Sequence, residues 1–186
     1  MDALIRDVRP AAVGIASAYV TAPGVEGVAQ SLKRYGASTC RLIAGTDGFV
    51  TQPGAIELAI RNGWTVRFGA HVRSGIFHPK LMVLGNRFGP TGCLQRASGF
   101  YIGSGNLTTQ GLYSNLELGV VGTSGTVANE AAAAFGELWT ASRPVTKGNL
   151  ATYAARFADE ARRRRPQELR DFGIEGSGSD QPPSIA

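Results

Sequence analysis

A titratable imidazole and a cation lie close together within an apolar stretch of the sequence. His78 and Lys80 are two positions apart in FHPKLMVLG, a run that otherwise has the composition of a buried strand. Successive side chains of a strand point to opposite faces, so these two share a face. A histidine can act as a nucleophile or transfer protons, and a neighbouring ammonium can neutralise negative charge. The pair therefore marks a candidate catalytic site.

Two strand-like runs downstream carry further polar residues. Ser104 and Asn106 lie two positions apart in YIGSGNLT, and Glu117 follows within NLELGVV. The glycines on either side of Ser104, Gly103 and Gly105, permit turn geometry and a close approach of the backbone to a bound group. Burying such polar groups without a purpose would cost free energy, so we expect them to share one site with the first pair.

Together these motifs are similar to those of the phospholipase D superfamily. The order His-x-Lys, Gly-Ser-Gly-Asn and then Asn-x-Glu occurs once, between residues 78 and 117. A single copy resembles the superfamily's small bacterial nucleases and its metal-independent restriction endonucleases. The resemblance implies a phosphodiesterase that needs no metal and no other cofactor, in a layered αβα fold.

The sequence departs from the family pattern in one stretch. The aspartate that usually follows the lysine by five residues is Gly85 here, and the spacing from Lys80 to the Gly-Ser-Gly-Asn motif is longer than usual. We attribute the extra length to residues 86–96, which we predict to be a hairpin connection or a surface loop. This loop either shapes substrate access or is a plain insertion. In the family the aspartate is thought to support structure more than chemistry.

The resemblance gives each motif residue a role. His78 would attack phosphorus and form a covalent phosphohistidine. Lys80 and Asn106 would bind the non-bridging oxygens, on which charge builds in the transition state, and Ser104 would add a hydroxyl group. Glu117 would accept a hydrogen bond from the other ring nitrogen of His78 and so fix its tautomer.

A single copy of the signature lacks one group that this chemistry needs. The departing alkoxide requires a proton, and His78 cannot be nucleophile and acid in the same step. The other histidine of the chain, His71, lies outside the motif, and we expect it to be an ordinary loop residue. In the superfamily, two copies of the signature face each other across one site. The resemblance therefore implies a two-fold homodimer.

Strand and helix patterns alternate around these motifs and favour parallel strands joined by crossover helices. The expected strands are 11–20, 38–45, 64–70, 76–85, 97–105 and 116–122. The expected helices are 25–36, 55–63, 126–142 and 149–165, with Asn149 as the N-cap of the last. We predict an α/β fold with a mixed, mostly parallel sheet between layers of helices, as in the phospholipase D-like αβα sandwich.

Length and composition indicate one domain in residues 1–172, followed by a Gly/Ser/Pro-rich tail or linker in 173–186. The formal net charge is +5 and suits an anionic partner such as nucleic acid. Apolar runs fall short of the roughly 18 residues that a membrane helix needs. The N-terminus has no signal-peptide pattern, and Cys40 and Cys93 are isolated, so we expect a cytoplasmic protein without membrane contact.

These observations predict an endonuclease that acts on DNA, and single-signature relatives imply a restriction or antiviral-defence setting. Arg73, Arg87 and Arg96 are candidate phosphate contacts beside the site, together with the backbone of Gly103 and Gly105. So small a domain leaves sequence specificity to a partner or a further domain. Two alternatives stay open: a phospholipase D or phosphatidyl transferase, and a catalytically degenerate nucleic-acid-binding module.

Overall fold

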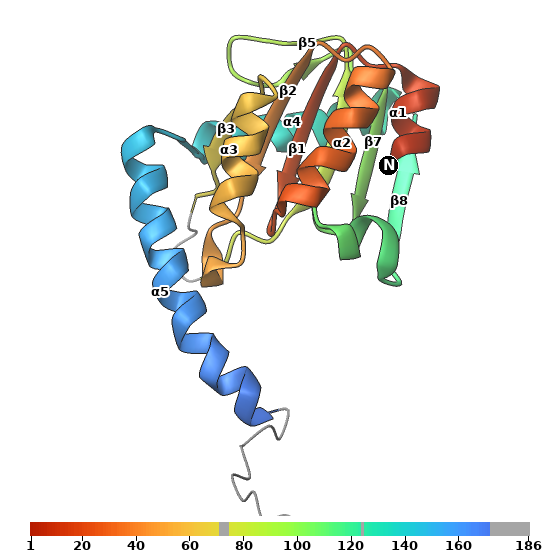
Figure 1. Cartoon of the computed structure of the whole chain (residues 1–186). Helices are drawn as coiled ribbons and strands as arrows, with labels where there is room; N and C mark the ends of the chain where they lie inside the picture. Colours follow the sequence, from red (N-terminus) through yellow and green to blue (C-terminus); the bar gives the residue numbers. More distant parts are fainter. Residues whose placement is uncertain (71–74, 124, 172–186) are drawn as a thin grey trace, which may run out of the picture.

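A seven-stranded mixed sheet forms the centre of the molecule (Figure 1). The computed structural model describes residues 1–70, 75–123 and 125–171, with side chains to residue 164. The strand order is β8-β7-β4-β1-β2-β3-β9. The strands are β1 (Ala12–Ser17), β2 (Thr39–Ala44), β3 (Thr65–Phe68), β4 (Lys80–Gly85), β7 (Gly99–Gly103), β8 (Gly119–Gly122) and β9 (Arg143–Pro144). β1, β2 and β3 are parallel neighbours, and the remaining neighbours pair antiparallel.

Helices cover both faces of this sheet, so the predicted αβα class is confirmed. Figure 1 shows α1, α2 and α3 on one face, α4 on the other, and α5 extending beyond the β3 side. Their bounds are α1 (Asp2–Val8), α2 (Ala22–Arg34), α3 (Pro53–Arg61), α4 (Gly125–Ala141) and α5 (Lys147–Asp171). Two short turns, η1 (Asp47–Phe49) and the π-helical η2 (Gln110–Ser114), lie in loops.

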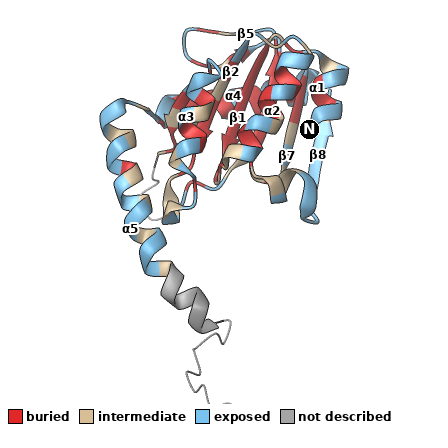
Figure 2. Ribbon diagram, viewed as in Figure 1, coloured by how far each residue is buried: buried red, intermediate tan, exposed pale blue. Residues whose placement is uncertain are grey.

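Strand β1 is buried along its whole length because helices lie on both sides of it (Figure 2). Val13 and Ile15 pack into the core shared with α1, α2 and α3. On the other face, Gly14 lets Phe135 of α4 come close, since a Cβ at this position would lie 2.9 Å from the Phe135 ring. The alternation of large and small residues along one strand therefore fixes which helix packs on which face.

Capping residues explain where two helices begin. α2 starts at Ala22, earlier than predicted, because the Thr21 hydroxyl accepts a hydrogen bond from Gly24 N–H at 3.4 Å. The prediction of Asn149 as the N-cap of α5 is wrong. Thr146 precedes the helix, and the two residues exchange bonds: Asn149 N–H donates to Thr146 Oγ1 (3.2 Å), and Thr146 N–H donates to Asn149 Oδ1 (2.8 Å). The short helix α1 was not predicted, and the tail predicted at 173–186 lies outside the described residues.

The long connection between β4 and β7 forms a small hairpin of β5 (Arg87–Phe88) and β6 (Leu94–Gln95). It sits against Gly85, where a Cβ would lie 2.9 Å from the Arg96 carbonyl oxygen and 3.0 Å from Leu94. The backbone of the inserted hairpin thus occupies the space that an aspartate side chain at position 85 would need. Glycine at position 85 and the long connection to β7 are therefore in direct contact.

Candidate active site

The predicted site residues gather at one edge of the sheet because the strands that carry them meet there. β1 ends at Ser17, directly opposite Lys80, the first residue of β4. β7 runs antiparallel to β4 and ends at Gly103, just before Ser104. β8 begins at Gly119, shortly after Glu117, and pairs with β7. The ends of β1 and β7 and the starts of β4 and β8 therefore lie side by side.

His78 and Lys80 contact each other directly. The Lys80 ammonium lies 2.9 Å from Nδ1 and 3.0 Å from Nε2 of His78, and it donates to the His78 carbonyl oxygen at 3.1 Å. This contact places a cation directly beside the ring of the candidate nucleophile.

Glu117 is held by two neighbours at the end of β7 and the start of β8. Its carboxylate accepts hydrogen bonds from Ser104 Oγ and, at 3.1 Å, from Asn115 Nδ2. These two bonds, with a smaller contribution from the Lys80 charge, lower the pKa of Glu117. In the described part of the chain, Glu117 forms no hydrogen bond with His78, so the tautomer-fixing role suggested for it stays a prediction.

Lys80 lies in a partly buried position that changes its acidity. Desolvation lowers the pKa of its ammonium, and the negative charge of Glu117 opposes this shift. The two charges therefore interact within one site, although the lysine comes from β4 and the glutamate precedes β8. A cation at this point can stabilise negative charge that develops next to His78.

Asn106 is positioned by residues at the end of β1 that the sequence did not single out. Its Oδ1 accepts a hydrogen bond from Tyr19 N–H (3.2 Å), and no described residue bonds its Nδ2. The buried Ser17 hydroxyl donates to Tyr19 O (2.7 Å) and accepts from Leu107 N–H (2.9 Å). The Tyr19 ring meets the His78 ring edge-on, 6.0 Å between centroids. Tyr19 therefore contacts both Asn106 and His78, and it holds the Asn106 amide in place through Oδ1.

The two glycines of the motif are required by close backbone contacts. A Cβ on Gly105 would lie 2.7 Å from Gly111 O, and a Cβ on Gly103 would lie 2.7 Å from Leu118 O. Gly105 N–H donates to the Tyr101 hydroxyl at 3.2 Å. These contacts fix the loop that carries Ser104 and Asn106. They give the glycines a positioning task, and contact with substrate stays a prediction.

An aspartate far away in sequence anchors the segment before His78. Asp47, which follows β2, accepts a hydrogen bond from Phe77 N–H at 2.7 Å. Gly69 packs against the Phe77 ring, since a Cβ there would lie 2.5 Å from it. Asp47, Ser17, Tyr19 and Asn115 were missed by sequence reasoning. The signal available for Asn115 was its place in the Asn-x-Glu motif, and Asp47 follows the predicted strand 38–45. Ser17 and Tyr19 lie within the predicted strand 11–20 and gave no signal of their own.

The arginines proposed as phosphate contacts do not join this site. Arg87 and Arg96 belong to the hairpin at the Gly85 end of β4, the end opposite Lys80. The prediction that they lie beside the site is wrong, and so is the alternative that the 86–96 loop shapes access to it. Arg87 Nε instead donates to Gln95 Oε1 at 2.9 Å. Arg73 and His71 lie outside the described residues.

The site is open to solvent in the single chain. His78 and Ser104 are exposed, and Lys80, Asn106 and Glu117 are half-buried. Within the described ranges, three or more histidine, cysteine, aspartate or glutamate side chains do not come together as a metal site would require. A search of the same ranges for helices long and apolar enough to cross a bilayer found none.

Comparisons with known proteins identify a family and similar folds. Residues 25–139 match the family model described as "Cardiolipin synthase, PLD-like domain". No curated protein matches the sequence. Among solved structures, Nuc from Salmonella typhimurium, a phospholipase D family member, is similar, with 17% identity, a TM-score of 0.58, and coverage of 78% of this chain and 88% of Nuc.

NucT from Helicobacter pylori is similar to the same degree, with 12% identity and a TM-score of 0.57. The match covers 77% of this chain and 87% of NucT. At such identities the two structures establish a common fold, whereas the family model spans more than half of the chain. The chain belongs to the phospholipase D-like family.

Proposed function

We propose that this protein is a metal-independent phosphodiesterase that cleaves DNA as an endonuclease. The observation that carries the proposal is the contact of the Lys80 ammonium with both ring nitrogens of His78. Membership of the phospholipase D-like family and a fold shared with Nuc and NucT support phosphodiester hydrolysis as the reaction. The net charge of +5 supports an anionic polymer as substrate.

The reaction proceeds in two displacements at phosphorus. A ring nitrogen of His78 forms a bond to phosphorus while the bond from phosphorus to the leaving oxygen breaks. Lys80 and Asn106 Nδ2 stabilise the charge on the non-bridging oxygens. Water then attacks phosphorus and gives its proton to His78 of a second copy, which lost a proton to the leaving oxygen in the first step. The nitrogen–phosphorus bond breaks, and the first imidazole is restored. Glu117, through Ser104, keeps the oxygen-binding loop in position.

The leaving oxygen takes its proton from His78 of a second copy, so the active species is a homodimer. An apolar rim next to the site supports this part of the proposal. Its members are Ile102, Leu116, Leu118 and Val120, all of them exposed. Leu116 and Leu118 flank Glu117, and β8 is the edge strand of the sheet. A second copy seated there would cover the rim and close the open site.

Cleavage of labelled DNA in excess EDTA tests the proposed reaction. We expect cleavage by the wild type and by Arg87→Ala, which changes an arginine at the far end of β4, and none by His78→Ala. Cleavage that EDTA abolishes would contradict the metal-independent mechanism. Turnover of phospholipid vesicles without DNA cleavage would favour the lipid enzyme instead, which the name of the matching family model makes the second candidate.

Analytical ultracentrifugation tests the dimer. Val120→Lys places a charge on the apolar rim and should give a monomer that has lost cleavage. Ile60→Lys is the matched control, because Ile60 is an exposed apolar residue of α3, away from the rim. A wild-type monomer with full activity at the assay concentration would contradict the dimer.

A restriction or defence setting is part of the proposal, and phage-plating assays with wild type and His78→Ala test it.

A further inference from the structure

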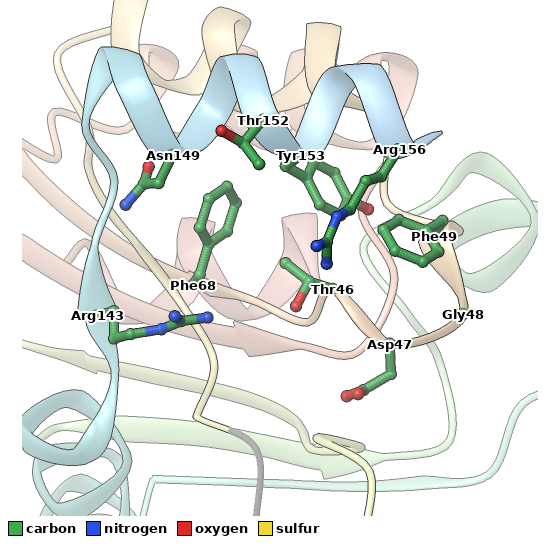
Figure 3. Close-up of a pocket in the computed structure, with 10 residues that line it drawn as sticks. All are labelled: Thr46, Asp47, Gly48, Phe49, Phe68, Arg143, Asn149, Thr152, Tyr153 and Arg156. Atoms are coloured by element: carbon green, nitrogen blue, oxygen red, sulfur yellow. The ribbon is translucent and has the colours of Figure 1, made fainter. Parts of the chain in front are cut away.

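A second pocket lies on the same edge of the sheet as the candidate active site (Figure 3). Its volume is about 430 Å³, within the ~300–1,000 Å³ typical of ligand sites. Its walls come from the segment after β2, the end of β3, strand β9 and helix α5. His78 does not line it, so the pocket is separate from the catalytic cluster.

One wall of the pocket is an aromatic surface. The Phe49 and Tyr153 rings are stacked, 5.7 Å between centroids with 23° between planes, and Phe68 packs against Tyr153 at 5.4 Å. The Tyr153 hydroxyl is fixed by donating to Thr51 O at 2.8 Å. Phe49 has φ +50°, a conformation that costs free energy for a bulky residue. The turn thus holds the Phe49 ring at the pocket despite the free-energy cost of this backbone conformation.

Two cations face this aromatic wall. Arg143 of β9 and Arg156 of α5 are both exposed, and Figure 3 shows their guanidinium groups directed into the pocket from different sides. In the part of the chain with described side chains, neither forms an ion pair. Asp47 contributes one carboxylate to the lining. Two cations against one anion favour a negatively charged ligand.

Asp47 connects the pocket to the active site. Its carboxylate lines the pocket and also accepts the hydrogen bond from Phe77 N–H, one residue before His78. The segment that carries His78 is therefore attached to the wall of the pocket, and a strand bound at His78 can extend toward it. The combination of a stacking surface with guanidinium groups is the one that proteins use to bind single-stranded nucleic acid.

We propose that this pocket binds the nucleotide next to the scissile phosphate of a single-stranded substrate. Its base lies against Phe49, and its phosphate lies between Arg143 and Arg156. The inference rests on the proposed nuclease function and adds the substrate subsite to it. A free nucleotide has the same chemistry, so the experiment has to separate the two sources.

The test measures binding by the non-cleaving variant His78→Ala. Fluorescence anisotropy compares a labelled oligothymidylate with an abasic oligonucleotide of the same length, at several salt concentrations. The Arg143→Ala/Arg156→Ala pair removes the cations. Phe49→Asn removes the ring with a residue that tolerates positive φ. Arg61→Ala, an exposed arginine of α3, is the matched control.

We expect the arginine pair to weaken oligothymidylate binding at least about fivefold and to reduce the slope of log K against log[salt] by about 1.4. The parent should prefer oligothymidylate over the abasic strand at least about fivefold, and Phe49→Asn should lose that preference. Arg61→Ala should match the parent. Pocket variants that bind both strands as the parent does would overturn the proposal.

Thymidine monophosphate separates the two sources of ligand. Binding of thymidine monophosphate that needs the two arginines, with oligonucleotide binding unaffected by them, would assign the pocket to a free nucleotide and overturn the proposal. Failure of the proposed function has a different signature, because the wild type would then not cleave DNA. Normal cleavage with unchanged binding by the pocket variants defeats the subsite alone.

Discussion

The two ends of strand β4 differ in what their residues do. At the Lys80 end, polar side chains lie at the surface and are held by hydrogen bonds from loops and strand ends. At the Gly85 end, the β5–β6 hairpin packs under α4, with Phe88 and Phe135 rings 6.2 Å apart. Charge placement dominates one end and packing the other. Substitutions should therefore separate activity from stability along a single strand.

Removal of the nucleophile, His78, should give the largest loss of activity without a loss of stability. His78→Ala should lower kcat by about 10⁴-fold or more, because no other group can form the covalent intermediate. The exposed side chain makes no core contacts, so the midpoint of urea unfolding should match the wild type. Steady-state kinetics and denaturant titration measure the two quantities. Retained cleavage in His78→Ala would place the nucleophile elsewhere.

Loss of one oxygen-binding group should have a smaller effect at the same end. Lys80→Ala and Asn106→Ala should each lower kcat by about 10²–10³-fold, the cost of removing a preorganised donor. Ser17→Ala should lower activity indirectly. It removes the hydroxyl that bonds Tyr19 O and Leu107 N–H, and these two residues lie next to Asn106 in space and in sequence. A change confined to KM in the first two variants would contradict transition-state stabilisation.

At the opposite end, restoring the family's aspartate should damage stability. Gly85→Asp puts a Cβ 2.9 Å from Arg96 O and 3.0 Å from Leu94, so the hairpin must move. We expect a loss of about 1–3 kcal/mol in the free energy of unfolding, with kcat close to wild type at temperatures where the protein stays folded. Higher activity in Gly85→Asp would show that the two ends are coupled.

The pH dependence gives the smallest effect. Burial lowers the pKa of Lys80, so its positive charge is lost at a lower pH than that of an ordinary lysine as pH rises. As pH rises, kcat/KM should therefore begin to fall before pH 10.5, the usual pKa of a lysine. Lys80→Arg should retain some activity and move this decline to higher pH, since guanidinium keeps its proton. An unchanged alkaline limb in Lys80→Arg would assign the decline to another group.

Sequence reasoning reached the fold class because periodicity and strand–helix order are local. It also named residues that the fold brings together, since His78 and Lys80 are close in sequence. Asp47 and Tyr19 escaped it, because their contacts with Phe77 and Asn106 join segments 30 and 87 residues apart. Arg87 and Arg96 were misplaced for the converse reason, since residues near in sequence to Lys80 lie at the other end of the strand.

The apolar character of 116–122 was misleading in the same way. The run was expected to be a strand with buried surroundings, yet Leu116 and Leu118 are 104% and 85% exposed in the single chain. Apolar side chains predict that a surface is buried, but they do not identify what covers it. The free side of an edge strand has no neighbouring strand in its own sheet to cover it. Periodicity does not distinguish a strand of the core from an edge strand with exposed apolar side chains.

The most direct test of the account is to trap the covalent intermediate. Wild type is mixed with internally ³²P-labelled DNA, quenched with alkali, and the labelled peptide is identified by mass spectrometry. We predict label on His78, none on His78→Ala, and a labelled fraction that forms as fast as product. Rapid turnover with no label on the protein, or with label on any residue other than His78, would contradict the mechanism.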